Sequence, residues 1–145
     1  MVNLTFLDEI VNATELRNNQ KYWLEAASHQ PVTIAYGKHK LALLSREKIA
    51  ELYRQNYYLD MALRLCTGKT DMPELAWVSS LDKDDRAEFT DEFVSAVNKA
   101  FSTHNWNEME TLLEDWKATA ETMQDKQAMR ALKSKIPNDK YIPLR

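Results

Sequence analysis

The sequence predicts a mixed α+β fold, in which a small β-α-β-β-α domain precedes a helical extension. Only two glycines and four prolines occur among 145 residues, and so few turn-forming residues favour helices over an all-β fold. Around Gly37, however, two apolar runs stand on either side of a turn, as they do in a two-stranded β-ribbon. With 44% apolar residues, the chain can form one domain, or a small domain with an extension.

The first domain is expected to open with a short strand in "EIVNA", residues 9–13, followed directly by a helix. Asn12 is the expected N-cap of this helix, and Glu15 stands three residues later, as in a variant of the capping box. The helix is expected to end near residues 28–31. Its apolar side carries Leu16, Trp23, Leu24 and Ala27.

The ribbon and a second helix complete the first domain. Val32 and Ile34 alternate with Thr33 before the turn, and leucines at 41, 43 and 44 follow it. A glycine at position 37 lets the turn adopt a positive φ. Ser45 is the expected cap of the second helix, in which apolar residues recur at helical spacing. These residues are Ile49, Leu52, Tyr53, Leu59 and Leu63.

The pattern breaks at residues 67–71, so we predict one domain over residues 1–68 and a helical extension over 69–145. A helix should begin near Asp82 and a second one at a cap on Asn105, which together form an αα-hairpin. Their facing apolar stripes are Phe89, Phe93, Val97 and Phe101 in the first helix and Met109, Leu112, Leu113, Trp116 and Met123 in the second. A shorter helix should then run to about Lys133, and an extended tail should follow from Lys135.

Composition argues against an enzyme, a metal protein and a membrane protein. Cys66 is the single cysteine, and the three histidines are far apart in the sequence, so we expect no metal site and no cofactor. No serine or cysteine lies in a nucleophile motif, and no apolar run approaches the length of a membrane span. We therefore expect a cytoplasmic protein without catalytic residues. The net charge of −3 means that any DNA binding must depend on a local basic patch.

Three segments in order, "NATELRNN", "QPVTI" and "GKHKLALLS", resemble the prevent-host-death (Phd/YefM) antitoxin family. Arg17 and Asn19 match the arginine and asparagine of that family's first helix, and Gly37 matches its turn glycine. Lys38 matches the basic residue after this glycine, and Ser45 matches the cap of the second helix. The resemblance covers a little under half of the chain, and Ala35-Tyr36 stand where the family usually has two basic residues.

The resemblance implies a homodimer that binds operator DNA through the first helix and the turn. It also implies a partner toxin, usually a small ribonuclease, bound by the second helix and the C-terminal region. The residues expected to contact DNA are Thr14, Arg17, Asn18, Lys21, Lys38 and Lys40. The alternative interpretation, with equal weight, is that the lysines in the turn are simply solvated at the tip of a hairpin and bind nothing.

The expected toxin-binding surface combines the outer face of the second helix with the C-terminal tail. Tyr57 and Tyr58 are adjacent, about 100° apart on a helix, so one can enter the core while the other stays outside. The expected contact residues are Tyr57, Tyr58 and Met61 on the helix and Ile136, Tyr141, Ile142 and Leu144 in the tail. Two other functions remain open: an interaction module that keeps the dimer scaffold without DNA binding, and a small enzyme with a cleft between the halves.

Overall fold

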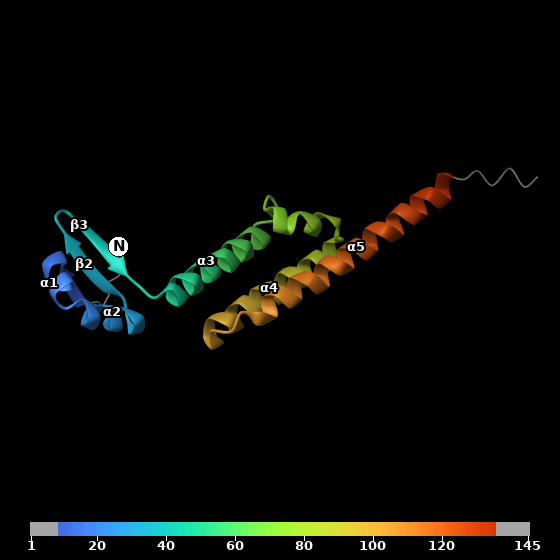
Figure 1. Ribbon diagram of the computed structural model, residues 1–145. Coiled ribbons are helices and arrows are strands. Elements are labelled where there is room, and N and C mark those ends of the chain that lie inside the picture. The colour runs from blue at the N-terminus through green and yellow to red at the C-terminus, as the bar shows by residue number, and fades with distance from the viewer. Residues whose placement is uncertain (1–8, 136–145) are drawn as a thin grey trace, which may run out of the picture. The chain divides into compact units, whose positions relative to one another are not determined.

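The computed structural model describes residues 9–135 and has a mixed α+β fold with a small three-stranded sheet, which confirms the predicted class (Figure 1). The chain divides between Gln55 and Asn56 into an N-terminal unit and a C-terminal unit. This division falls inside a long helix, α3 (Arg46–Cys66). The domain boundary after residue 68 stays a prediction.

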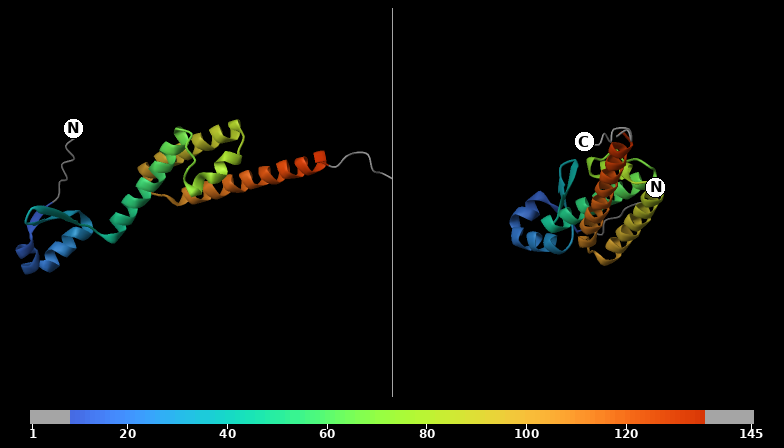
Figure 2. Two further views of the ribbon diagram at one scale, coloured as in Figure 1. Left: turned by 90° about the horizontal axis from the view of Figure 1, so that it is seen from above. Right: turned by 90° about the vertical axis from the view of Figure 1, so that its right-hand side faces the viewer.

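The elements of the N-terminal unit follow the predicted order, except that two helices stand where the sequence predicts one. It contains β1 (Glu9–Asn12), α1 (Ala13–Asn18), α2 (Gln20–His29), β2 (Val32–Tyr36) and β3 (His39–Leu43), followed by α3. The central strand is β2, which pairs in parallel with β1 and antiparallel with β3. Both helices of the β1-to-β2 connection lie against the same face of the sheet (Figure 2).

The predicted first helix is divided in two at Asn19. Asn12 caps α1 as expected, because its Oδ1 accepts a hydrogen bond of 2.8 Å from the Glu15 N–H. Asn19 then leaves the helical conformation, with φ −122° and ψ 42°, and α2 begins at Gln20. Two asparagines in succession explain the break, since asparagine is a weak helix former whose side chain competes for backbone hydrogen bonds.

The core of the N-terminal unit is small. The side chains of Val11, Trp23, Ala27 and Val32 are buried, with Leu16, Ala26, Ile34 and Leu43 packed around them. Since a small domain buries a smaller fraction of its surface than a large one, each of these side chains contributes a large share of the stability of this unit.

The turn after α3 lies at the predicted break. Gly68 has φ +69°, and the N–H groups of Gly68 and Lys69 donate to the carbonyls of Leu65 and Arg64, which is the Schellman arrangement. Arg64 also bonds to Asp60 at 3.0 Å and to Asp71 at 2.6 Å. The hydrogen bond from Arg64 lowers the pKa of the Asp71 carboxyl. These contacts connect the end of α3 to the chain that follows.

Beyond the turn, the C-terminal unit contains a 3₁₀ helix, η1 (Pro73–Ser80), and the predicted antiparallel hairpin of α4 (Lys83–Thr103) and α5 (Asn107–Lys135) (Figure 1). His104 has a left-handed conformation at the end of α4, and Asn105 Oδ1 accepts a hydrogen bond from the Asn107 N–H. The separate shorter helix near Lys133 was a wrong prediction, because α5 continues unbroken to Lys135. No residue that favours a helix end interrupts it.

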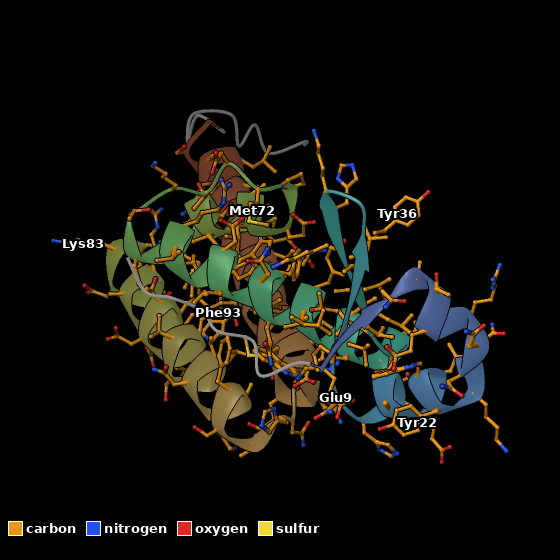
Figure 3. All side chains as sticks on the ribbon, turned by 90° about the vertical axis from the view of Figure 1, so that its left-hand side faces the viewer. Glu9, Tyr22, Tyr36, Met72, Lys83 and Phe93 are labelled. Carbon is orange, nitrogen blue, oxygen red and sulfur yellow. The ribbon has the colours of Figure 1, made fainter. Side chains whose placement is uncertain are left out.

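The core of the C-terminal unit combines α3, η1, α4 and α5. Phe89 and Phe93 are its largest fully buried side chains, and Phe93 points into the unit (Figure 3). Leu112, Leu113 and Trp116 pack around this core as predicted, whereas Phe101 is 37% exposed and packs edge-on against Trp106. The remaining buried residues of this core are Tyr58, Met61, Ala62, Leu65, Leu75, Val78, Leu81, Val97, Ala100, Trp106, Met109 and Ala120.

We expect Asp82→Ala to destabilise the C-terminal unit by about 1 kcal/mol through loss of the N-cap of α4. The Asp82 carboxylate accepts hydrogen bonds of 3.0 and 2.9 Å from the N–H groups of Asp84 and Asp85. Urea unfolding measures the effect. Asp82→Asn keeps a hydrogen-bond acceptor at this position, so it should lower the free energy of unfolding clearly less than Asp82→Ala does. If both variants lower it equally, the cap hydrogen bonds contribute little.

Candidate nucleic-acid interface

The strand register places the β2–β3 turn and the start of α1 at the same edge of the sheet. Asn12, the last residue of β1, pairs with Ala35, and Ala35 pairs on its other side with Lys40. Since neighbouring strands are about 4.8 Å apart, the backbones of Asn12 and Lys40 are roughly 10 Å apart. The first turn of α1 therefore begins beside the strand ends that carry Lys38 and Lys40.

The turn itself consists of two residues, Gly37 and Lys38, between the paired residues Tyr36 and His39. Gly37 has φ +57°, a conformation that residues with a side chain rarely adopt. A Cβ at this position would meet no atom within 4 Å, so the backbone conformation alone requires glycine. This short, paired turn holds the backbones of Lys38 in the turn and Lys40 in β3 in a defined position.

All the residues expected to contact DNA have exposed side chains: Thr14, Arg17, Asn18, Lys21, Lys38 and Lys40. Within residues 9–135, no carboxylate forms an ion pair with Arg17 or with the lysines at positions 21, 38 and 40. Glu15 is the single acidic residue between positions 10 and 24, and none occurs between positions 26 and 46. The edge formed by α1 and the turn is thus locally basic, although the whole chain is acidic.

Arg17 and Lys21 lie on different helices, although the single predicted first helix would contain both. The sequence places them one turn apart on a single helix, but the break at Asn19 leaves Arg17 at the end of α1 and Lys21 at the start of α2. Arg17 shares α1 with Thr14 and Asn18, and this helix begins at the basic edge. Lys21 belongs to a different helix from these three residues, so the set of exposed cations is not confined to α1 and the turn.

Tyr36 is a candidate contact that sequence reasoning missed. It ends β2 next to the turn, it is 62% exposed, and its ring points away from the strand (Figure 3). An exposed tyrosine beside cations can donate a hydrogen bond from its phenol hydroxyl to a DNA phosphate. The signal in the sequence was an aromatic residue immediately before "GKHK", where the family has basic residues.

The structure corrects the predicted partner surface on α3. Tyr57 is 39% exposed and Tyr58 is buried, so the expected division between these adjacent tyrosines is confirmed. Tyr58 stacks on Trp106 with ring centroids 5.4 Å apart, and Met61 is fully buried, so neither lies on an outer face. Partial burial and the nearby Glu74 carboxylate raise the pKa of Tyr57.

The tail residues of the predicted partner surface, Ile136, Tyr141, Ile142 and Leu144, lie outside the residues that the structure describes. Within the described range, no group of three histidine, cysteine or acidic side chains is arranged to hold a metal ion. Among the helices of residues 9–135, none has both the length and the apolar character to cross a membrane. The exposed basic edge therefore remains the best-defined candidate site.

Comparison with known proteins identifies no relative of this chain. No family model matches the sequence, and no curated protein or solved structure matches it either.

Proposed function

We propose that the protein is an antitoxin-like transcriptional regulator of a type II toxin–antitoxin system, which binds operator DNA as a dimer and neutralises a toxin. The observation that supports this proposal best is the strand register, which brings the start of α1 and the β2–β3 turn, with the exposed lysines Lys38 and Lys40, to one edge of the sheet. The element order β1-α1-α2-β2-β3-α3, in which two helices replace the single first helix of the predicted β-α-β-β-α order, also supports it, as does the resemblance to Phd/YefM antitoxins. The partner would be a small ribonuclease, as is usual in that family.

The chemistry of the edge suits a DNA duplex. Lys38, Lys40 and Arg17 can each neutralise a phosphate, and such contacts supply most of the sequence-independent affinity of DNA-binding proteins. Thr14 and Asn18 are exposed polar residues on α1, and hydroxyl and amide groups can bond to base edges or phosphates. A two-fold dimer would present this edge twice, as a palindromic operator requires.

We expect Arg17→Ala and Lys38→Ala each to weaken binding to duplex DNA from upstream of the gene of this protein. Loss of one phosphate contact reduces the slope of log K against log salt by roughly 0.9, which corresponds to about tenfold in affinity at 0.1 M salt. Fluorescence anisotropy titrations at several salt concentrations measure both quantities.

The matched control for these variants is Lys83→Ala, which removes an exposed lysine from the first residue of α4 in the other unit. Its affinity and salt slope should equal those of the wild type. If the control reduces the slope as much as Lys38→Ala does, the binding reflects general charge and the assigned edge is wrong.

The second candidate function is a protein–protein interaction module without DNA binding. Large apolar side chains that the structure leaves exposed favour it, among them Ile10, Tyr22, Leu41, Leu52 and Leu63. Complete absence of DNA binding by the wild-type protein, together with a stable complex with a partner protein, would support this alternative.

A further inference from the structure

Helix α3 carries two different apolar stripes. One enters the core of the C-terminal unit through Tyr58, Met61 and Leu65. The other is exposed to solvent and comprises Ile49, Leu52, Leu59 and Leu63, each at least 39% exposed. In steps of about 100° per residue, the centre of the exposed stripe lies roughly 160° around the helix from the centre of the buried stripe. Within residues 9–135, no other element covers the exposed stripe.

The spacing of the exposed stripe is that of a coiled coil. Its residues recur at alternating intervals of three and four, with Asn56 and the exposed Cys66 completing the series: Ile49, Leu52, Asn56, Leu59, Leu63 and Cys66. In heptad notation, Ile49, Asn56 and Leu63 occupy a positions, while Leu52, Leu59 and Cys66 occupy d positions. Packing against the core of the C-terminal unit accounts for the buried stripe of α3 but not for this second series with heptad spacing.

We propose that this series is the seam of a two-stranded, parallel, in-register coiled coil with a second copy of the chain. The seam along α3 would be about 26 Å long at 1.5 Å per residue. A two-fold axis parallel to the helix places each residue of the stripe opposite the same residue of the other copy. Both chains therefore use the same stripe in the interface. The inference concerns how two chains associate, and it does not depend on DNA binding.

Asn56 selects both the partner and its orientation. In the parallel arrangement Asn56 faces Asn56 of the other copy, and the two amides can bond to each other, as a single asparagine at an a position does in parallel dimers. In an antiparallel alignment of the same stripe, Asn56 would face Leu59, which buries an amide without a hydrogen-bond partner. The parallel alignment avoids this cost.

The residues that flank the seam also fit a parallel dimer. In that arrangement each g position faces the following e position of the other helix, which pairs Lys48 with Tyr53 and Gln55 with Asp60. No two like charges face each other across the seam. A seam of this length is short, so we expect dissociation constants in roughly the micromolar range rather than nanomolar.

Sedimentation velocity over about 1–100 μM tests the seam in the full chain. The wild type should dimerise, and Leu63→Glu should weaken dimerisation about tenfold or more, because it places a carboxylate at the centre of an a layer. Leu63 is 60% exposed, so its replacement leaves the core intact. The matched control is Leu132→Glu on α5, where the leucine is 61% exposed and the substitution should not change dimerisation.

Disulfide formation at Cys66 tests whether the two α3 helices of the proposed dimer are parallel and in register. It is the only cysteine, so any disulfide must join two chains. In the parallel, in-register seam the two Cys66 side chains share a d layer, close enough for a disulfide. Treatment with diamide, which accepts the two electrons and two protons of the thiols, should give a covalent dimer in the wild type and in Leu132→Glu.

Leu63→Glu should slow this cross-linking by at least about tenfold. A wild-type monomer at 100 μM overturns the proposal, and so does cross-linking that proceeds equally in Leu63→Glu. If Leu63→Glu dimerises as strongly as the wild type, the proposal is also wrong and other surfaces form the dimer. That result would not contradict the proposed regulatory function. Failure of DNA binding with the seam intact would reject the regulatory function alone.

Discussion

Replacing Phe89 with alanine should destabilise the C-terminal unit by about 3–5 kcal/mol, a large part of the total stability of a domain. Phe89 is fully buried, and its ring lies within 5.7 Å of three other aromatic rings, those of Trp77, Phe93 and Trp116, measured between centroids. Alanine would leave a cavity where helices α4 and α5 and the 3₁₀ helix η1 meet. Urea unfolding followed by circular dichroism at 222 nm measures the loss.

Phe101→Ala is the matched control, since it removes the same side chain from the same helix. Phe101 is partly exposed and packs on Trp106 alone among the rings of the described residues, so its replacement should cost clearly less than Phe89→Ala. Equal losses for the two variants would contradict the core that the structure assigns to this unit.

Trp23→Ala should unfold the N-terminal unit while the C-terminal helices remain folded. Trp23 is the largest buried side chain in a core that otherwise consists of Val11, Ala27 and Val32. Its loss costs about 3–5 kcal/mol, which is comparable to the whole stability of a small domain. Hydrogen exchange should show loss of protection in β1, β2 and β3, and DNA binding should disappear with the sheet.

Trp23→Phe separates the contribution of the ring from that of the indole N–H. Trp23 Nε1 is buried and has no hydrogen-bond partner within the described residues, so phenylalanine removes an unsatisfied donor and keeps most of the apolar ring. This variant should keep the sheet folded. If it unfolds the unit as completely as Trp23→Ala does, the small core tolerates no change of shape at this position.

Local features of the fold could be predicted because their chemistry is contained in a few neighbouring residues. Asn12 and Asp82 cap α1 and α4, because each side chain accepts backbone hydrogen bonds at the helix start. Asn105 lies two residues before the start of α5, and its Oδ1 accepts a hydrogen bond from the N–H of Asn107, the first residue of that helix. Gly37 marks the turn because its positive φ is a property of that residue alone. The predicted element order follows from these local signals.

Features that depend on distant contacts could not be predicted. Helix α3 has apolar residues on two sides, and only the positions of α4 and α5 decide that Tyr58 and Met61 enter the core. The continuity of α5 likewise follows from packing and from the absence of a breaking residue. The break at Asn19 had a local signal, since two asparagines adjoin there, but the apolar spacing around it still fits one continuous helix.

For the candidate site, the sequence suggested the residues, and the structure shows that the β2–β3 turn and the start of α1 lie at one edge of the sheet. Lys38 and Lys40 follow a turn glycine, so their exposure could be expected from the ribbon alone. That the turn lies at the edge where α1 begins depends on the parallel pairing of β1 with β2, for which the sequence offers no register. Contact of these residues with DNA stays a prediction.

The most direct test of the regulatory function is a competition titration of the wild-type protein at about 0.1 M salt. Labelled duplex from upstream of its own gene competes with unlabelled duplex of the same length and unrelated sequence. We predict preferential binding of the upstream duplex by at least about 10³-fold, the lower end for specific DNA-binding proteins. Equal affinity for both duplexes, or binding to neither, would contradict the assignment of an operator-binding regulator.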